Sequence, residues 1–343
     1  IINRRVLEQN IAALSPDMAA GERRALLLSW LKSAYQAGSA EIRRRFEQAN
    51  AENDLPDYGQ MAARSTAYLT DQILRIMYDE ASLRLYPAAN PTAQDHMSLI
   101  AVGGYGRFEM APYSDIDLLF LVPWKPTPHC EQIIEHMIYM LWDMGLKLGH
   151  AVRGIDHCLN LARSDSSIRA AILDARYVWG EPQIFADFRR QFDLILQADG
   201  AEFAREKWGE RQRRHEKMDD SRYVLEPNIK EGIGGLRDVQ TLIWVARFAW
   251  RIESATDLVD RNILTHSEAR QFEKSYEFLW KLRFHLHYLA GRAEERIIFD
   301  LQPELARRLH YTDRQSGKGV ERFMKFYFLV ARWVGELGRI IEA

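Results

Sequence analysis

The 343-residue chain carries 46 Lys and Arg against 48 Asp and Glu, a formal net charge of −2, and 47% of its residues are hydrophobic. This balance is ordinary for a globular protein of one or two domains, and it provides no global attraction to nucleic acid or to an anionic membrane. There is no apolar run of membrane-spanning length, and the only two cysteines, Cys130 and Cys158, form no CxxC pair. A disulfide framework is therefore not indicated, and a cytoplasmic protein is expected.

The N-terminal region has the pattern of helices. Apolar residues recur at three- and four-residue spacing over 24–31 and 68–77, which predicts helices up to about residue 86. The polar stretch 50–57 contains Pro56 and predicts a break between helices, and the proline-containing stretch 87–95 predicts a loop. Because the chain begins with Ile1 and not Met, we expect further residues before it.

A short α/β region follows the N-terminal helices. Apolar runs predict buried strands at 98–102 and 116–122, and a third strand is expected at 149–154. Helical spacing returns at 131–146, and 169–178 fits either a helix or a strand. From about Phe185 onward the pattern is helical, interrupted at 226–235. We therefore expect an α+β fold, with an N-terminal helical segment (1–59), a domain built on a small mixed sheet (60–184) and a C-terminal helical domain (185–343).

The most informative segment runs from Gly103 to Asp117, with the sequence GGYGRFEMAPYSDID. Successive strand side chains alternate between faces, so Asp115 and Asp117 are expected on the same side of the second strand. Two neighbouring carboxylates repel each other unless a cation lies between them. Mg²⁺ takes oxygen ligands of this kind and completes its coordination with substrate phosphates, so we predict a magnesium site at Asp115 and Asp117.

The glycines before the carboxylates suggest a phosphate site. Gly103 and Gly104 directly follow a predicted strand, and the lack of a Cβ lets the backbone approach a ligand. Their N–H groups suit phosphate oxygens, and Arg107 is expected to add positive charge. Ser114 is expected either to support the loop or to touch the nucleotide. An exposed turn is the alternative interpretation of the Asp pair.

A strand, Gly-Gly, about ten residues and Asp-x-Asp on the next strand resemble the signature of polymerase β-type nucleotidyltransferases. The string GGYGRFEMAPYSDIDLLFL is similar to that of bacterial PII uridylyltransferases, as are LEPNIKEGIGGLRD (225–238) and ERFMKFY (321–327). The resemblance covers residue 68 to the C-terminus. It implies transfer of UMP from UTP, with Mg²⁺, to a tyrosine hydroxyl of the PII nitrogen-signalling protein.

The chain also departs from that family's pattern. Members of the family are longer and carry an HD phosphohydrolase domain and two ACT domains, whereas this chain has no His-Asp dipeptide. We expect uridylyl removal and glutamine sensing to reside elsewhere. The superfamily commonly uses a third carboxylate on a later strand, and here Asp156 and Asp174 are the candidates.

Two further segments leave alternatives open. Gly234-Gly235-Leu236-Arg237-Asp238 fits a structural turn before a helix or a nucleotide-contacting loop, with Lys230 and Arg237 as its binding residues. Glutamine synthetase adenylyltransferases have a similar Gly-Gly-x-Arg-Asp block. Residues 205–217 carry charges of both signs and are typical of a solvated helix face, with a docking surface for a protein substrate as the alternative.

Three functions remain open at this point. The resemblance favours PII uridylylation, with PII and UTP as partners and neither nucleic acid nor membrane. The second reading is another nucleotidyltransferase on the same scaffold, either an adenylyltransferase acting on a protein such as glutamine synthetase or a polymerase. The third is a regulatory module with the same fold and no catalysis.

Overall fold

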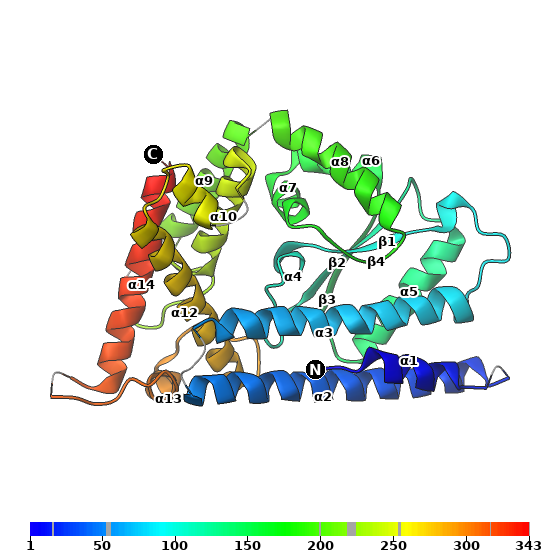
Figure 1. The fold of residues 1–343 in the computed structure, drawn as a ribbon, viewed down its shortest axis with the longest axis horizontal. Helices are drawn as coiled ribbons and strands as arrows, with labels where there is room; N and C mark the ends of the chain where they lie inside the picture. The colour runs from blue at the N-terminus through cyan, green and yellow to red at the C-terminus, as the bar shows by residue number, and fades with distance from the viewer. Residues whose placement is uncertain are drawn as a thin grey trace. The chain divides into compact units, whose positions relative to one another are not determined.

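The computed structural model describes residues 1–15, 17–52, 56–198, 200–217, 224–252, 255–315 and 317–342 (Figure 1). The chain forms two compact units. The first consists of Ile1–Glu47 and Ala62–Ile195, and the second of Gln48–Met61 and Leu196–Ala343. Among the described residues, no helix is long and apolar enough to cross a membrane.

The first unit contains the sheet. Its elements, with three helices (α2, α3 and α8) that begin or end outside it, are α1 (Arg4–Ala12), α2 (Ala20–Glu52), α3 (Tyr58–Glu80), η1 (Ala81–Leu85), η2 (Ala93–Asp95), β1 (Ser98–Ala101), α4 (Gly103–Gly106), β2 (Ile116–Val122), α5 (Pro128–Asp143), β3 (Leu148–Gly154), α6 (Ile155–Ser164), α7 (Ser166–Leu173), β4 (Arg176–Gly180) and α8 (Pro182–Ala198). The expected α+β fold with a small mixed sheet is confirmed.

The four strands lie in the order β3-β2-β1-β4. Strand β1 is antiparallel to both of its neighbours, and β2 is parallel to β3. Because β3 is an edge strand, it contacts the sheet through β2 alone. The segment 169–178, which fits a helix or a strand in the sequence, contains parts of both: α7 ends at Leu173 and β4 begins at Arg176.

Strand β2 shows the alternation that the sequence predicts. Ile116, Leu118, Phe120 and Val122 are buried in a core with side chains from α2, α3 and α5. Residues 117, 119 and 121 therefore face the other side of the sheet. Figure 1 shows α3 on one side of the sheet and α7 and α8 on the other.

Two capping groups fix the helices that flank the sheet. The Thr127 hydroxyl accepts a hydrogen bond from the Cys130 N–H at the start of α5, and Pro128 occupies the first turn. Asp165 caps α7 by accepting hydrogen bonds from the N–H groups of Ser167 and Ile168. Such caps satisfy backbone donors that have no partner within the helix.

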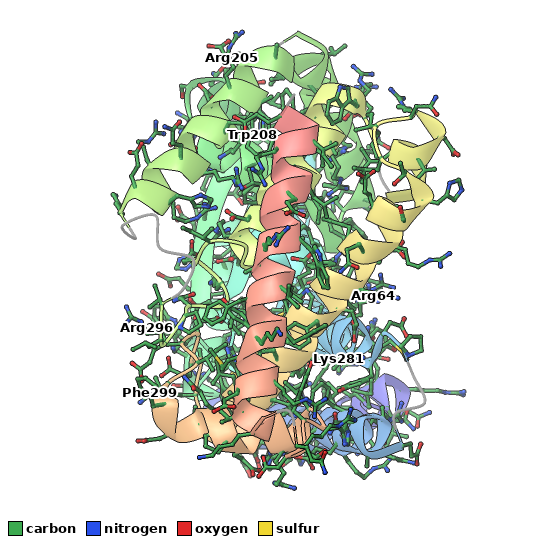
Figure 2. All side chains as sticks on the ribbon, turned by 90° about the vertical axis from the view of Figure 1, so that its left-hand side faces the viewer. Arg64, Arg205, Trp208, Lys281, Arg296 and Phe299 are labelled. Atoms are coloured by element: carbon green, nitrogen blue, oxygen red, sulfur yellow. The ribbon has the colours of Figure 1, made fainter. Side chains whose placement is uncertain are left out.

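The second unit is helical. It contains α9 (Gly200–Glu216), α10 (Leu236–Trp250), α11 (Ala255–Asp260), α12 (His266–Ala290), η3 (Phe299–Leu301), α13 (Gln302–Arg308) and α14 (Gly319–Glu342). Part of its core joins α10, α11 and the C-terminal end of α14. Figure 2 shows α14 and α12 of this unit, with Trp208 of α9 beside the upper part of α14. The predicted break at 50–57 falls between α2 and α3, and residues 53–55 lie outside the described part of the chain.

Candidate active site

A tight glycine turn connects β1 to the short helix α4. Gly103 has a φ of +58°, a left-handed conformation that glycine adopts without a steric penalty. The N–H groups in the first turn of a helix have no partner within the helix, so α4 begins with donors available to a ligand. At Gly106 the turn lies so close to the chain after α7 that a Cβ would be 2.1 Å from the carbonyl oxygen of Asp174.

The two predicted carboxylates lie where the turn meets β2. Asp115 is exposed and directly precedes the strand, and Asp117 is its second residue. The Asp117 carboxylate lies between two glycines: a Cβ built on Gly103 would be 3.4 Å from its Oδ2, and one built on Gly149 would be 2.6 Å from its Oδ1. The structure therefore brings Gly103 and Asp117 together, and it leaves space around the carboxylate.

Gly149 is a site residue that the sequence does not reveal. It lies on β3 opposite Asp117 in the parallel register. Any side chain at this position would collide with the carboxylate. The local signal for Gly149 is only a glycine near the start of a predicted strand, which indicates close approach of another group but not which group.

Asp117 lines a cleft of about 420 Å³ within the first unit. Its floor comes from β2 and β3 and its wall from α7. The lining residues are Val102, Gly103, Asp117, Leu118, Leu119, Gly149, His150, Ala151, Arg153, Ser167, Ile168, Ala171 and Ile172. A mostly apolar cleft with a few convergent polar groups is the usual form of a small-molecule site.

Arg107 lies under the glycine turn and is held by two carboxylates. Its side chain is 6% exposed and pairs with Glu109 at 2.8 Å and with the fully buried carboxylate of Asp174. The role of Arg107 as a phosphate ligand stays a prediction; in this structure its guanidinium links α4 to the end of α7. The Ser114 hydroxyl accepts a hydrogen bond from the Ala111 N–H at 3.1 Å, which supports the loop.

A second buried network, formed by Tyr105, Asp71 and Arg176, connects the glycine turn to α3 and β4. The Tyr105 hydroxyl donates to Asp71 on α3 at 2.6 Å, and Arg176 on β4 donates to both oxygens of the same carboxylate at 2.8 and 3.0 Å. Burial, and then the negative charge of Asp71, raise the pKa of Tyr105 well above its usual value, so the phenol stays protonated and donates. The turn is therefore fixed before any ligand binds.

The third carboxylate is not found with the other two. Asp156 is exposed at the start of α6, and Asp174 pairs with Arg107. Within the ranges that the structure describes, no three His, Cys, Asp or Glu side chains gather in a way that could hold a metal ion. Asp115 is exposed and Asp117 lines the cleft, so the two carboxylates fit an ion that takes its remaining ligands from a bound nucleotide and water.

The second Gly-Gly block lies in the other unit and has a structural basis. Gly234 has a φ of +74°, and a Cβ there would lie 2.2 Å from the carbonyl oxygen of Ala331 on α14. Its N–H donates to the buried Asp238 carboxylate at 2.8 Å. The predicted binding residue Arg237 contacts Glu231 at 3.1 Å and Gln240 at 2.9 Å. Lys230 is half-buried, and burial together with the charge of Arg283 lowers its pKa.

The prediction of a solvated face for 205–217 is wrong for one side of α9. Lys207 is 2% exposed, and Arg211, Arg214 and His215 all contact Asp238. Burial alone would raise the pKa of Asp238, but the His215 hydrogen bond and the two guanidinium charges hold it below its usual value. The sequence alone does not indicate this contact, because α9 carries charges of both signs and the carboxylate that Arg211, Arg214 and His215 contact lies on α10.

The chain resembles known proteins over its whole length. A family model described as GlnD PII-uridylyltransferase matches residues 202–341. The chain is 46% identical over 345 residues to the bifunctional uridylyltransferase/uridylyl-removing enzyme of Azospirillum brasilense and 48% identical over 349 residues to that of Rhodospirillum rubrum. The corresponding enzyme of Novosphingobium aromaticivorans is 42% identical over 345 residues. These matches cover 100% of this chain but only 36–37% of each relative.

The structure places the glycine turn and the carboxylates, on which the resemblance to nucleotidyltransferases rests, together at one end of the mixed sheet and beside the cleft. Over its whole length the chain is similar to the bifunctional uridylyltransferase/uridylyl-removing enzymes, and it spans about a third of their length.

Proposed function

We propose that this chain transfers UMP from UTP to a tyrosine hydroxyl of a PII protein and releases pyrophosphate. The observation that carries the proposal is the Asp117 carboxylate, held between Gly103 and Gly149 at the mouth of the cleft and one residue from the exposed Asp115. The relatives' names support the nucleotide and the reaction, and the name of the matching family model supports PII as the acceptor.

The residues of the cleft divide the reaction between them. Asp115 and Asp117 would hold Mg²⁺, which supplies positive charge for the phosphates and for the tyrosine oxygen. The amides at Gly103 and Gly104 would hold phosphate oxygens so that the α-phosphorus lies in line with the incoming hydroxyl. The tyrosine oxygen forms a bond to the α-phosphorus, the bond to the β-phosphate oxygen breaks, and the phenolic proton passes to solvent.

The test is incubation of the 343-residue chain with a PII protein, Mg²⁺ and each of the four α-labelled nucleoside triphosphates. We expect label on PII with UTP alone, and none when the acceptor tyrosine is replaced by phenylalanine. The same assay with glutamine synthetase as acceptor and labelled ATP tests the adenylyltransferase alternative. Labelling of that acceptor, or no labelling with any nucleotide, would overturn the proposal.

A further inference from the structure

The arginines nearest the glycine turn are already engaged. Arg107 pairs with Glu109 and Asp174. Arg176 pairs with Asp71 and lies 3.8 Å above the ring of Phe108. Releasing either one for a ligand would leave a buried carboxylate without its cation, which is strongly destabilising. The positive charge that a triphosphate needs must come from another part of the cleft.

Arg153 on β3 is the arginine that lines the cleft. It lies opposite Leu121 in the register of β2 and β3, whereas Gly149 lies opposite Asp117. Arg153 and Asp117 therefore share one face of the sheet, and their positions along the strands are four residues, or about 13 Å, apart. The lining between them is apolar, with Leu119 and Ala151 on the floor and α7 forming the wall.

The thiol that lies near Arg153 carries no charge. Burial raises the pKa of Cys158 on α6 to about 11, although the charge of Arg153 acts in the opposite direction. At neutral pH the thiol is therefore protonated and does not neutralise the guanidinium. Over the ranges that the structure describes, Arg153 forms no ion pair with a carboxylate, in contrast to Arg107. A half-buried guanidinium without a counter-ion is suited to an anionic ligand.

We propose that Arg153 binds the terminal phosphates of the nucleoside triphosphate. The phosphate chain then runs along the sheet from the α-phosphate at Asp117 toward Arg153. The inference rests on the proposed function, because it takes the cleft as the nucleotide site. It assigns to Arg153 the phosphate-binding role that the sequence suggests for Arg107.

Binding of nucleotides to the intact chain tests this assignment without any turnover. We would measure the affinities of Mg²⁺-UTP and of UMP by calorimetry for the wild type, Arg153→Gln, Arg153→Lys and the control Arg163→Gln. Arg163 is an exposed arginine on α6 whose side chain donates a hydrogen bond to the side chain of Asn160 at 3.0 Å. Circular dichroism and thermal melts report whether each variant is folded, and Arg153→Lys keeps a charge at the site if Arg153→Gln unfolds.

Loss of a charge-assisted contact predicts that UTP affinity falls roughly 10- to 100-fold in Arg153→Gln and less in Arg153→Lys, with UMP affinity and Arg163→Gln unchanged. Unchanged UTP affinity in a folded Arg153 variant, or equal losses for UTP and UMP, would overturn the inference. A wild-type chain that binds another nucleoside triphosphate in place of UTP contradicts the proposed function alone, and Arg153 is then judged on that nucleotide. A wild-type chain that binds none contradicts both.

Discussion

At the scale of single residues, the site depends on where side chains are missing as well as on where they are present. Asp117 is useful as a ligand only if its carboxylate reaches the cleft, and two glycines leave the space for it. Gly103 also adopts a left-handed conformation that places the start of α4 beside the carboxylate. Charge and empty space are therefore specified together at this end of the sheet.

Removal of either carboxylate charge should stop the transfer without unfolding the protein. We expect Asp115→Asn and Asp117→Asn to lower the single-turnover rate at least about a hundredfold, since each would remove a metal ligand. The thermal midpoint should stay within a few degrees, because a like-charge repulsion is also relieved. Rates of UMP transfer and melting curves give the two readings, and near-wild-type turnover in either variant would contradict the metal assignment.

Gly149→Ala tests the space around Asp117. The added methyl would lie 2.6 Å from Oδ1, so the carboxylate must rotate or shift. Displacements of about 1 Å at a reacting centre cost roughly a hundredfold in rate, and we expect a loss of that order with little change in stability. Gly21→Ala on α2 is the matched control, since a Cβ there meets nothing within 4 Å. A Gly149→Ala variant as active as this control would show that the carboxylate tolerates another position.

The sequence predicts part of this site for a physical reason. Gly103, Asp115 and Asp117 carry local signals, because a turn after a strand and alternation along the next strand follow from short-range geometry. Gly149 and Arg153 gain their positions from the register between β2 and β3, which is set by packing and leaves no mark on either segment alone. The ion pair between Arg107 and Asp174 is likewise not evident from the sequence, because the two residues are 67 positions apart and meet only through packing.

At the scale of elements, apolar spacing predicts strands β1, β2 and β3 and the long helices, whereas β4 stays ambiguous and charged helices are harder to interpret. Helix α9 looks solvated because its charges alternate, yet one side of it meets a buried carboxylate on α10. A comparable ion pair joins α12 to the chain that follows it. There Glu295 accepts hydrogen bonds from Arg283 at 3.1 and 2.5 Å.

This ion pair should make the second unit sensitive to acid. Burial would raise the pKa of Glu295, but His287 and Arg283 lower it to about 2, from 4.5 in the unfolded chain. A depressed carboxylate pKa gives stability that is present above about pH 4.5 and is lost as the pH falls toward 2. We expect Glu295→Gln to cost about 2–3 kcal/mol at pH 7 and much less at pH 3.

Urea unfolding of the wild type and of Glu295→Gln at the two pH values measures this difference. Glu273→Gln, a change at an exposed position on the same helix, serves as the control and should track the wild type. An equal gap between the wild type and Glu295→Gln at pH 7 and at pH 3 would show that the ion pair does not carry the acid sensitivity.

At the scale of the whole molecule, the relatives' name combines two activities, and this chain spans 36–37% of their length. Its sequence contains no His-Asp dipeptide. We therefore expect the 343-residue chain to add UMP and not to remove it. Incubation with PII that carries labelled UMP should release no label, with the Asp117→Asn preparation as a control for co-purifying enzymes. Release that persists after extensive purification and tracks the chain itself would contradict this expectation.

The close approach of Gly234 to α14 bears on how far a shared motif can be trusted as a guide to substrate. A side chain at this position would collide with the Ala331 backbone, and Asp238 of the same block is enclosed by cations from α9. Selection for such contacts would act on helix packing, whatever molecule the enzyme modifies. Proteins that share the block could then differ in their acceptors while retaining it as common architecture, and divergence in specificity should be sought in residues that line the cleft.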